Sequence, residues 1–299
     1  MAGVRLLPPL VLVPVLALCA CTGPGPEPTG ATMPERVDIS EYADVRAGLD
    51  AANETMTFPI DAFFLSPAAL GRVGQANAVL WDECMREGGR TYPPAAFDLT
   101  TSGILPDTVY GIWSPENARQ WGYGLDPARD AVMEAANEAL MAAAAADSGW
   151  DPAFDVCLET TPRIPEPGRW FSGDDELAIS GPAKQVADDA KMLAMTDPRW
   201  DEARARWTDC LVAEGLRLRE GETSPWAPEV PEDPEAAIRT AVLDVECKAR
   251  TELVETLSSL EAQYQAALID RERAALDEVA EKEREIVERA DRIIAGSGR

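Results

Sequence analysis

Two similar stretches of sequence decide the fold of this chain: Trp81-Asp82-Glu83-Cys84-Met85-Arg86-Glu87-Gly88 and Trp207-Thr208-Asp209-Cys210-Leu211-Val212-Ala213-Glu214-Gly215. In both stretches tryptophan and cysteine are three residues apart, which places them on one face of a helix. Each stretch runs into glycine, a common helix terminator, although the glycine is offset by one position between them. We interpret the two stretches as copies of one helical unit; the alternative is a chance similarity of short sequences.

Each copy is followed by an aromatic, proline-rich turn and later by a further cysteine, Cys157 or Cys247. In an exported chain without a C-x-x-C motif, such widely spaced cysteines favour disulfides over a zinc site. One bridge per copy predicts Cys84 bonded to Cys157 and Cys210 bonded to Cys247. Four cysteines allow three connectivities, and the sequence alone does not select one of them.

Helix start signals recur along the body. A capping Ser or Asp precedes a proline at Ser66-Pro67, Ser114-Pro115, Asp126-Pro127, Asp197-Pro198 and Asp233-Pro234. Proline at the first helical position after such a cap is a typical start of a helix. The sequence therefore predicts a mainly α protein: a disulfide-stapled helical body over residues 58–233, short extended segments at 97–101 and 216–219, and a long C-terminal helix.

The C-terminal segment, residues 234–299, predicts one or two long helices. Between Pro234 and Gly296 it contains neither proline nor glycine, and apolar residues recur at near-helical spacing. We expect its first half to pack on the body through Cys247. The second half, about residues 269–295, is charged on most faces, and we expect it to project and offer a narrow apolar stripe to an envelope protein. The alternative is a solvated spacer.

The first twenty residues read as a secretory signal. Arg5 precedes an apolar run from Leu6 to Leu18, and Leu18-Cys19-Ala20-Cys21 is typical of a bacterial lipobox. We expect cleavage before Cys21 and lipidation of that cysteine; the alternative is an ordinary secreted protein cut near Ala20. The following residues, 21–57, begin with a Pro- and Gly-rich run and are predicted to form a flexible tether. The expected location is the extracytoplasmic face of the cell membrane.

Charge and composition exclude several classes of function. With 27 Lys and Arg against 53 Asp and Glu, the net charge is −26, which repels nucleic acid and anionic lipid. The chain contains no histidine, so Ser-His-Asp and Cys-His catalysis are excluded. We predict no catalytic residues, no metal site and no cofactor. The acidic run Asp174-Asp175-Glu176 is a weak calcium candidate that lacks EF-hand spacing, and a solvated charge run is the favoured interpretation.

Aromatic residues between the two copies are the candidate ligand-binding residues. Aromatic faces often line sugar or peptide grooves, and the candidates here are Trp113, Trp121, Tyr123 and Trp170. The alternative is that these rings fill the core or brace turns.

The chain resembles a group of uncharacterised lipoproteins from actinobacteria. The matching pieces are Trp207-x-x-Cys210, Trp121-Gly122-Tyr123-Gly124 and the stretch from Ala241 to Lys248. The resemblance covers most of the mature body, with Leu211 and Leu243 departing from the usual pattern. It implies an envelope location and carries no assigned activity.

Three hypotheses follow for function. The first is a non-enzymatic, lipid-anchored interaction or scaffold protein of the cell envelope. The second is a lipoprotein that binds a small ligand, a sugar or peptide, at the central aromatic residues. The third, a hydrolase with paired carboxylates, requires two close acids of perturbed pKa in a cleft.

Overall fold

An α-helix or a 3₁₀ turn begins at each predicted helix start. In the computed structural model, which describes residues 33–101, 105–170, 173–219 and 226–297, each capping side chain accepts a hydrogen bond from a backbone N–H of the first turn. Asp126 caps a 3₁₀ turn, η5 (Pro127–Asp130), that leads into the next α-helix. The described residues from Pro34 onwards form one compact unit.

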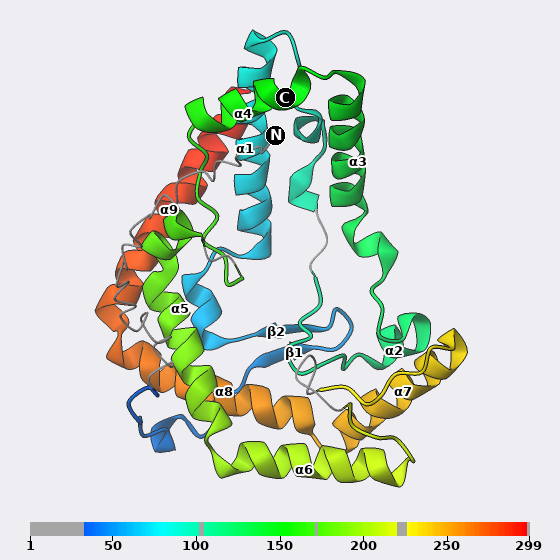
Figure 1. Ribbon diagram of the computed structural model, residues 1–299. Coiled ribbons are helices and arrows are strands. Elements are labelled where there is room, and N and C mark those ends of the chain that lie inside the picture. Colours follow the sequence, from blue (N-terminus) through cyan, green and yellow to red (C-terminus); the bar gives the residue numbers. More distant parts are fainter. Residues whose placement is uncertain (1–32, 102–104, 171–172, 220–225, 298–299) are drawn as a thin grey trace, which may run out of the picture. The chain divides into compact units, whose positions relative to one another are not determined.

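The described part of the chain is mainly helical, with nine α-helices (Figure 1). They are α1 (Pro67–Glu87), α2 (Pro115–Trp121), α3 (Ala131–Ala146), α4 (Trp150–Thr160), α5 (Asp174–Met195), α6 (Pro198–Ala213), α7 (Pro234–Arg250), α8 (Leu253–Arg271) and α9 (Arg273–Gly296). Further 3₁₀ turns are η1 (Ser40–Tyr42), η2 (Pro59–Phe63), η3 (Pro93–Ala96) and η4 (Leu99–Thr101). The strands β1 (Gly48–Asp50) and β2 (Thr55–Thr57) form an antiparallel hairpin in which Leu49 pairs with Met56.

Two disulfides each join a pair of helices, with the connectivity that the copies predicted. Cys84 of α1 is bonded to Cys157 of α4, and Cys210 of α6 is bonded to Cys247 of α7. The Cα atoms are 5.8 Å and 5.6 Å apart, an ordinary separation for a disulfide.

The glycine offset between the copies disappears in three dimensions. Gly89, not Gly88, is the counterpart of Gly215: both have positive φ, 71° and 78°, which suits glycine because it lacks a Cβ. In each case the residue after the glycine donates its N–H to a carbonyl five residues back, Arg90 to Met85 and Leu216 to Leu211. Both helices therefore end in the same Schellman-type turn.

The largest core cluster lies where α5, α6 and α8 meet the N-terminal segment. Its fully buried side chains include Trp207, Leu211, Leu257 and Leu268. A separate cluster joins α1, α3 and α4 around Met85 and Trp150, and a small one joins α2 to α7.

The prediction of a mainly α fold with a long C-terminal helix is confirmed, since α9 spans Arg273–Gly296. The C-terminal segment differs from the finer prediction in two ways. It forms three helices, because the chain breaks at Thr251–Glu252, where Glu252 adopts a left-handed conformation, and again at Glu272. The last helix does not project: α9 packs along α1 and α5 (Figure 1). Its apolar stripe is buried, with Leu276, Val279 and Ile286 each at most 8% exposed. Apart from Glu283, the charged residues that suggested projection lie on its outer face.

One acidic side chain is buried with that stripe. Glu283 lies on the inner face of α9, and its Oε1 has no hydrogen-bond partner among the described residues. The residues around the Glu283 carboxyl include Leu65 and Ile286, so its surroundings are largely apolar.

The predicted tether is wrong for its second half. Val37, Ile39 and Val45 pack against the main core, and Met56 is buried in it. Tyr42 also donates its hydroxyl to Asp270 of α8 at 2.6 Å. Prolines are confined to the earlier part of the segment, and these later apolar residues suffice to dock it; the first part, with the signal and Cys21, lies outside the described residues.

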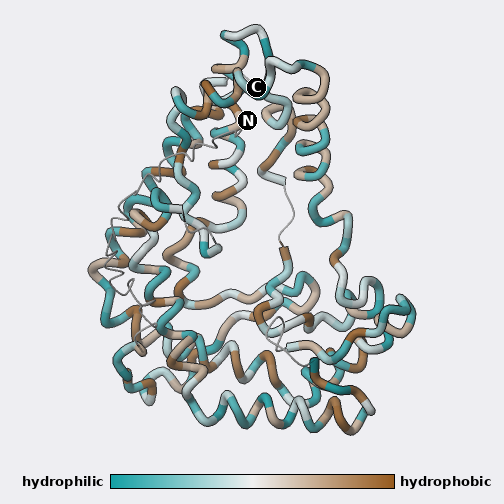
Figure 2. The backbone as a smooth tube through the Cα atoms, viewed as in Figure 1, coloured by the Kyte–Doolittle hydropathy of each residue, from teal (hydrophilic) through white to brown (hydrophobic). Residues whose placement is uncertain are grey.

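The two predicted extended segments differ in outcome. Leu99–Thr101 is the 3₁₀ turn η4, whereas residues 216–219 include an isolated antiparallel bridge between Leu218 and Pro228. Both sequences were too short for periodicity to separate a strand from a turn. None of the described helices is long and apolar enough to cross a membrane, since hydrophilic residues recur along them (Figure 2).

Candidate functional site

The acidic run after Gly173 forms a helix start. Asp174 and Asp175 occupy the first turn of α5, where carboxylates favour the helix dipole. Glu176 is buried and forms an ion pair with Arg163, whose guanidinium donates a hydrogen bond to the carboxylate at 2.6 Å. This hydrogen bond lowers the pKa of Glu176. Within the residues that the structure describes, no group of three or more Cys, Asp or Glu side chains is arranged to hold a metal ion.

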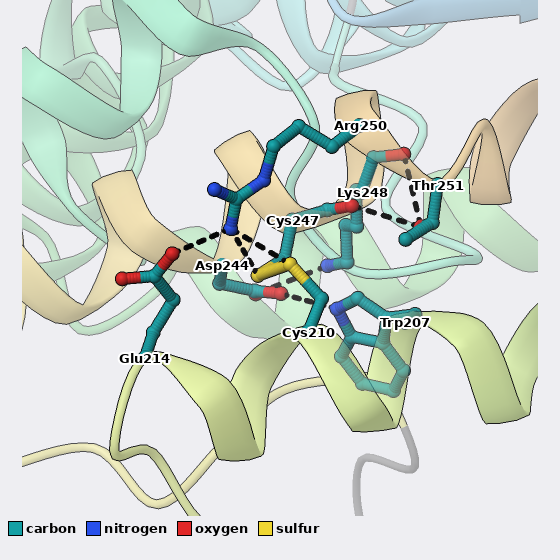
Figure 3. Close-up of a disulfide and its surroundings, with 8 residues drawn as sticks. All are labelled: Trp207, Cys210, Glu214, Asp244, Cys247, Lys248, Arg250 and Thr251. Atoms are coloured by element: carbon teal, nitrogen blue, oxygen red, sulfur yellow. Dashed lines mark hydrogen bonds and ion pairs between the residues drawn. A yellow bond between two sulfur atoms is a disulfide. The ribbon is translucent and has the colours of Figure 1, made fainter.

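A buried ion pair lies beside the second disulfide. Asp244 and Lys248 are one turn apart on α7, with Nζ 3.1 Å from Oδ2 and both side chains almost fully shielded from solvent. The indole N–H of Trp207 donates to Asp244 at 2.9 Å, and the Tyr123 hydroxyl donates to it at 3.2 Å. Figure 3 shows this pair next to the Cys210–Cys247 bridge.

Lys248 also holds two loops together. Its ammonium donates to the carbonyls of Ile112 and Trp226, each at 2.9 Å. Gly111, at φ 75°, lets the chain approach closely: a Cβ there would collide with the Trp226 carbonyl and lie 2.6 Å from Nζ. Burial raises the pKa of Asp244 and lowers the pKa of Lys248, while their mutual attraction opposes both shifts. All three ammonium hydrogens are used inside the protein, so the pair is a structural staple.

Glu261 of α8 is the centre of a second buried polar cluster. It accepts from the Tyr110 hydroxyl at 2.6 Å and from Lys191 at 3.1 Å, while Gln265 donates to its other oxygen. The Lys191 ammonium lies 4.0 Å from the centre of the Tyr110 ring, and burial lowers its pKa. Arg169 is 3.9 Å from the carboxylate. Arg169 also lies 3.6 Å from Asp61, so two cations face two carboxylates in a largely buried cluster, which also marks it as structural.

The four aromatic candidates do not converge on one cavity. Trp113 is buried and donates its indole N–H to Asp107, Trp121 ends α2, and Trp170 is 69% exposed with its ring against Arg169. Tyr123 lines the smaller of the two hollows described below. Trp113 and Trp170 therefore differ in their surroundings, one in the core and the other on the surface.

A surface groove that the sequence analysis missed runs between the 105–106 loop, η5 and α3. Its volume is about 760 Å³, and the large apolar residues of its lining are Leu105, Leu125 and Met141, which we call its apolar floor. These side chains are 62%, 56% and 69% exposed, among the highest values for large apolar residues in the described chain. Leu125 also lines a smaller recess of about 350 Å³ that contains Tyr123, so the two hollows adjoin.

Acidic side chains line the groove together with this floor. They are Asp126, Asp130, Glu134 and Glu138, and the single basic residue of the lining is Arg129. The Arg129 guanidinium donates to the Asn53 carbonyl in the β1–β2 turn, which ties the hairpin to the groove. The signal for this site in the sequence is the repeat of acids at intervals of four with no basic residue in α3.

Comparison with known proteins found no match among protein-family models, curated proteins or solved structures. The function is therefore inferred from the residues of this chain alone.

Proposed function

We propose that this chain is a lipid-anchored, non-enzymatic interaction protein on the extracytoplasmic face of the cell membrane, and that its groove receives another envelope component. The observation that carries the proposal is the clustering of Leu105, Leu125 and Met141 in one hollow. Single exposed apolar residues are normal, but several gathered in one groove are typical of a contact surface.

Two features support export. The Leu18-x-Ala20-Cys21 pattern after an apolar run is typical of a lipoprotein signal. Two disulfides favour an oxidising compartment, since such bridges are rare where thiols are kept reduced.

The groove is a better candidate contact surface than the C-terminal helix. The apolar stripe of α9 is buried against α1, so only the charged outer face of that helix remains for a partner. A small-ligand site at the four aromatic candidates has less support, because their side chains are dispersed.

Anchoring is tested by fractionation of cells that express the full chain. Cys21→Ser should move the protein from the membrane to the soluble fraction, because it removes the expected lipid attachment. Cys19→Ser is the matched control and should leave the protein at the membrane. Retention of the Cys21→Ser protein at the membrane would contradict the proposed anchor.

Partner contact is tested by a photo-reactive amino acid placed at Met141 in the native host. Val212 on α6, 63% exposed and outside the groove, is the matched control position. We expect a discrete adduct from position 141 that is absent from position 212, and that disappears when Cys21→Ser releases the protein. Equal yields at both positions would contradict the groove as a contact surface.

A further inference from the structure

We infer that the groove between η5 and α3 binds a cationic amphipathic segment of a partner protein, with lysine or arginine residues one helical turn apart. The inference rests on the proposed function and specifies the chemistry of the partner.

The apolar floor supplies a reason to bind. Leu105, Leu125 and Met141 come from three separate parts of the chain and are each more than half exposed. Removal of large apolar side chains from water stabilises a complex. The floor therefore favours a partner that presents apolar residues along one face.

The rim determines the charge of that partner. Asp130, Glu134 and Glu138 follow one another at intervals of four, so their carboxylates lie along one side of η5 and α3. None of the three has an ion-pair partner among the described residues. Within α3, Glu134 and Glu138 are like charges one turn apart, an arrangement that is unfavourable in a helix, whereas Asp130 precedes the helix as its N-cap residue.

Elsewhere in the chain this spacing is filled in both ways. Opposite charges pair at Lys184–Asp188 and Glu288–Arg292, whereas acids also follow one another at intervals of four along two other helices, on α4 at Asp151, Asp155 and Glu159 and on α9 at Asp277, Glu281 and Glu285. An acidic row is therefore not unusual in this chain by itself. What distinguishes this row is that its carboxylates line one groove with three exposed apolar side chains and create a negative potential beside them.

The alternative occupants conflict with these charges. A second copy of the chain has a net charge of −26, and nucleic acids and anionic lipids are also negative. A basic helix fits both parts of the groove: apolar residues contact the floor, and cations one turn apart match the carboxylates.

The test uses the full chain and a synthetic amphipathic peptide of leucine, alanine and lysine, about 18 residues long so that it forms a helix. Binding is measured by fluorescence anisotropy at low and high salt. The control peptide has glutamate in place of every lysine. We expect the cationic peptide to bind more weakly as salt is raised, and the acidic peptide not to bind.

Charge reversal in the groove gives the decisive comparison. Glu134→Lys with Glu138→Lys should weaken binding of the cationic peptide at least about tenfold, because two attractions become repulsions. Asp155→Lys with Glu159→Lys is matched in charge change and exposure but lies on α4, and should change affinity less than about threefold, by long-range effects only. Met141→Ser should also weaken binding, whereas Val212→Ser should not. Equal effects of the two charge reversals would overturn the inference.

The cellular cross-link separates this inference from the proposed function. An adduct at position 141 whose yield is unaffected by Glu134→Lys with Glu138→Lys would overturn the cationic partner and leave the proposed function standing. Selective binding of the cationic peptide without any cellular adduct would support the inference and count against the proposed function.

Discussion

The two W-x-x-C units have the same disulfide-bonded pair of helices, which we call the disulfide frame, but differ in the side chains that pack beside the disulfide. In both, the first cysteine is half-buried on one helix and the second is buried on the partner helix. Both partner helices have a threonine as their C-cap residue, four residues after the second cysteine, and the Thr161 and Thr251 N–H groups donate to the cysteine carbonyls. The repeat therefore extends beyond the motif that identified it.

The residue three positions before the second cysteine differs between the units. In the first unit it is Phe154, which packs edge-on against Trp81 at 5.8 Å between ring centres. In the second it is Asp244, which accepts the Trp207 indole N–H and pairs with Lys248. The same position thus builds an aromatic cluster in one unit and a buried polar staple in the other. A shared disulfide frame does not dictate the polarity of the core beside it.

The largest expected loss of stability comes from a substitution at the residue after the second cysteine, which tests that difference in polarity. Lys248→Ala should destabilise the protein by about 3 to 5 kcal/mol, because it leaves Asp244 buried without a counter-charge. The matched change in the first unit, Leu158→Ala, affects a side chain that is 47% exposed and should cost less than about 1 kcal/mol. Urea unfolding followed by tryptophan fluorescence measures both.

A double variant sharpens the result. Lys248→Met with Asp244→Asn removes both charges, so it should lose less stability than the sum of the single changes. Additive losses would show that the two charges do not stabilise each other.

Removal of the disulfides is the next largest effect. Replacing both cysteines of either bridge by alanine should cost about 2 to 5 kcal/mol. The loops span 73 and 37 residues, so loop-closure entropy predicts that loss of Cys84–Cys157 costs about 0.6 kcal/mol more. Calorimetry of the two variants checks the order, and a larger loss for the shorter loop would show that native packing outweighs chain entropy.

The tryptophans should respond unequally to the loss of their indole N–H. Trp207→Phe removes a buried hydrogen bond to Asp244 and should cost roughly 2 to 3 kcal/mol, with the smaller ring adding to the loss. Trp81 is partly exposed and makes mainly edge-on ring contacts, so Trp81→Phe should cost about 1 kcal/mol or less. Thermal unfolding by circular dichroism distinguishes the two; equal losses would argue against the polar staple as the difference between the units.

The smallest effect tests the feature that the units share. Gly89→Ala and Gly215→Ala should each destabilise by about 1 to 2 kcal/mol, because alanine is strained at positive φ. Gly88→Ala is the control; its φ is −85°, and its cost should be at most about 0.5 kcal/mol. If Gly88→Ala were the more damaging change, the structural alignment of Gly89 with Gly215 would be wrong.

The sequence predicted those parts of the fold that depend on residues close together in the chain. Caps such as Ser66 and Asp197 act within one turn, and the Trp-Cys spacing fixes a helix face. The break at Glu252 was missed because it contains neither proline nor glycine. The docking of α9 was missed because the charges on its outer face masked a narrow stripe that needs α1 to bury it.

The candidate site could not be predicted in the same way. Its floor combines residues from three parts of the chain that only folding brings together, and its acidic row resembles the rest of an acidic sequence. The aromatic candidates were chosen by residue type, which does not distinguish the buried Trp113 from the exposed Trp170.

The buried carboxyl of Glu283 makes the stability of the fold depend on pH. Its apolar surroundings raise its pKa to about 7, above the ordinary value of 4.5. Between these two values the folded protein holds a proton that the unfolded chain has released, so this group's contribution to stability is complete below pH 4.5 and declines as the pH rises toward 7. Glu283→Gln should remove that decline, with a gain over the parent chain on the order of 1 to 2 kcal/mol at pH 8, after allowance for solvent screening, and little gain at pH 4.5. The packing of α9 against α1 is therefore more stable at mildly acidic pH than at alkaline pH.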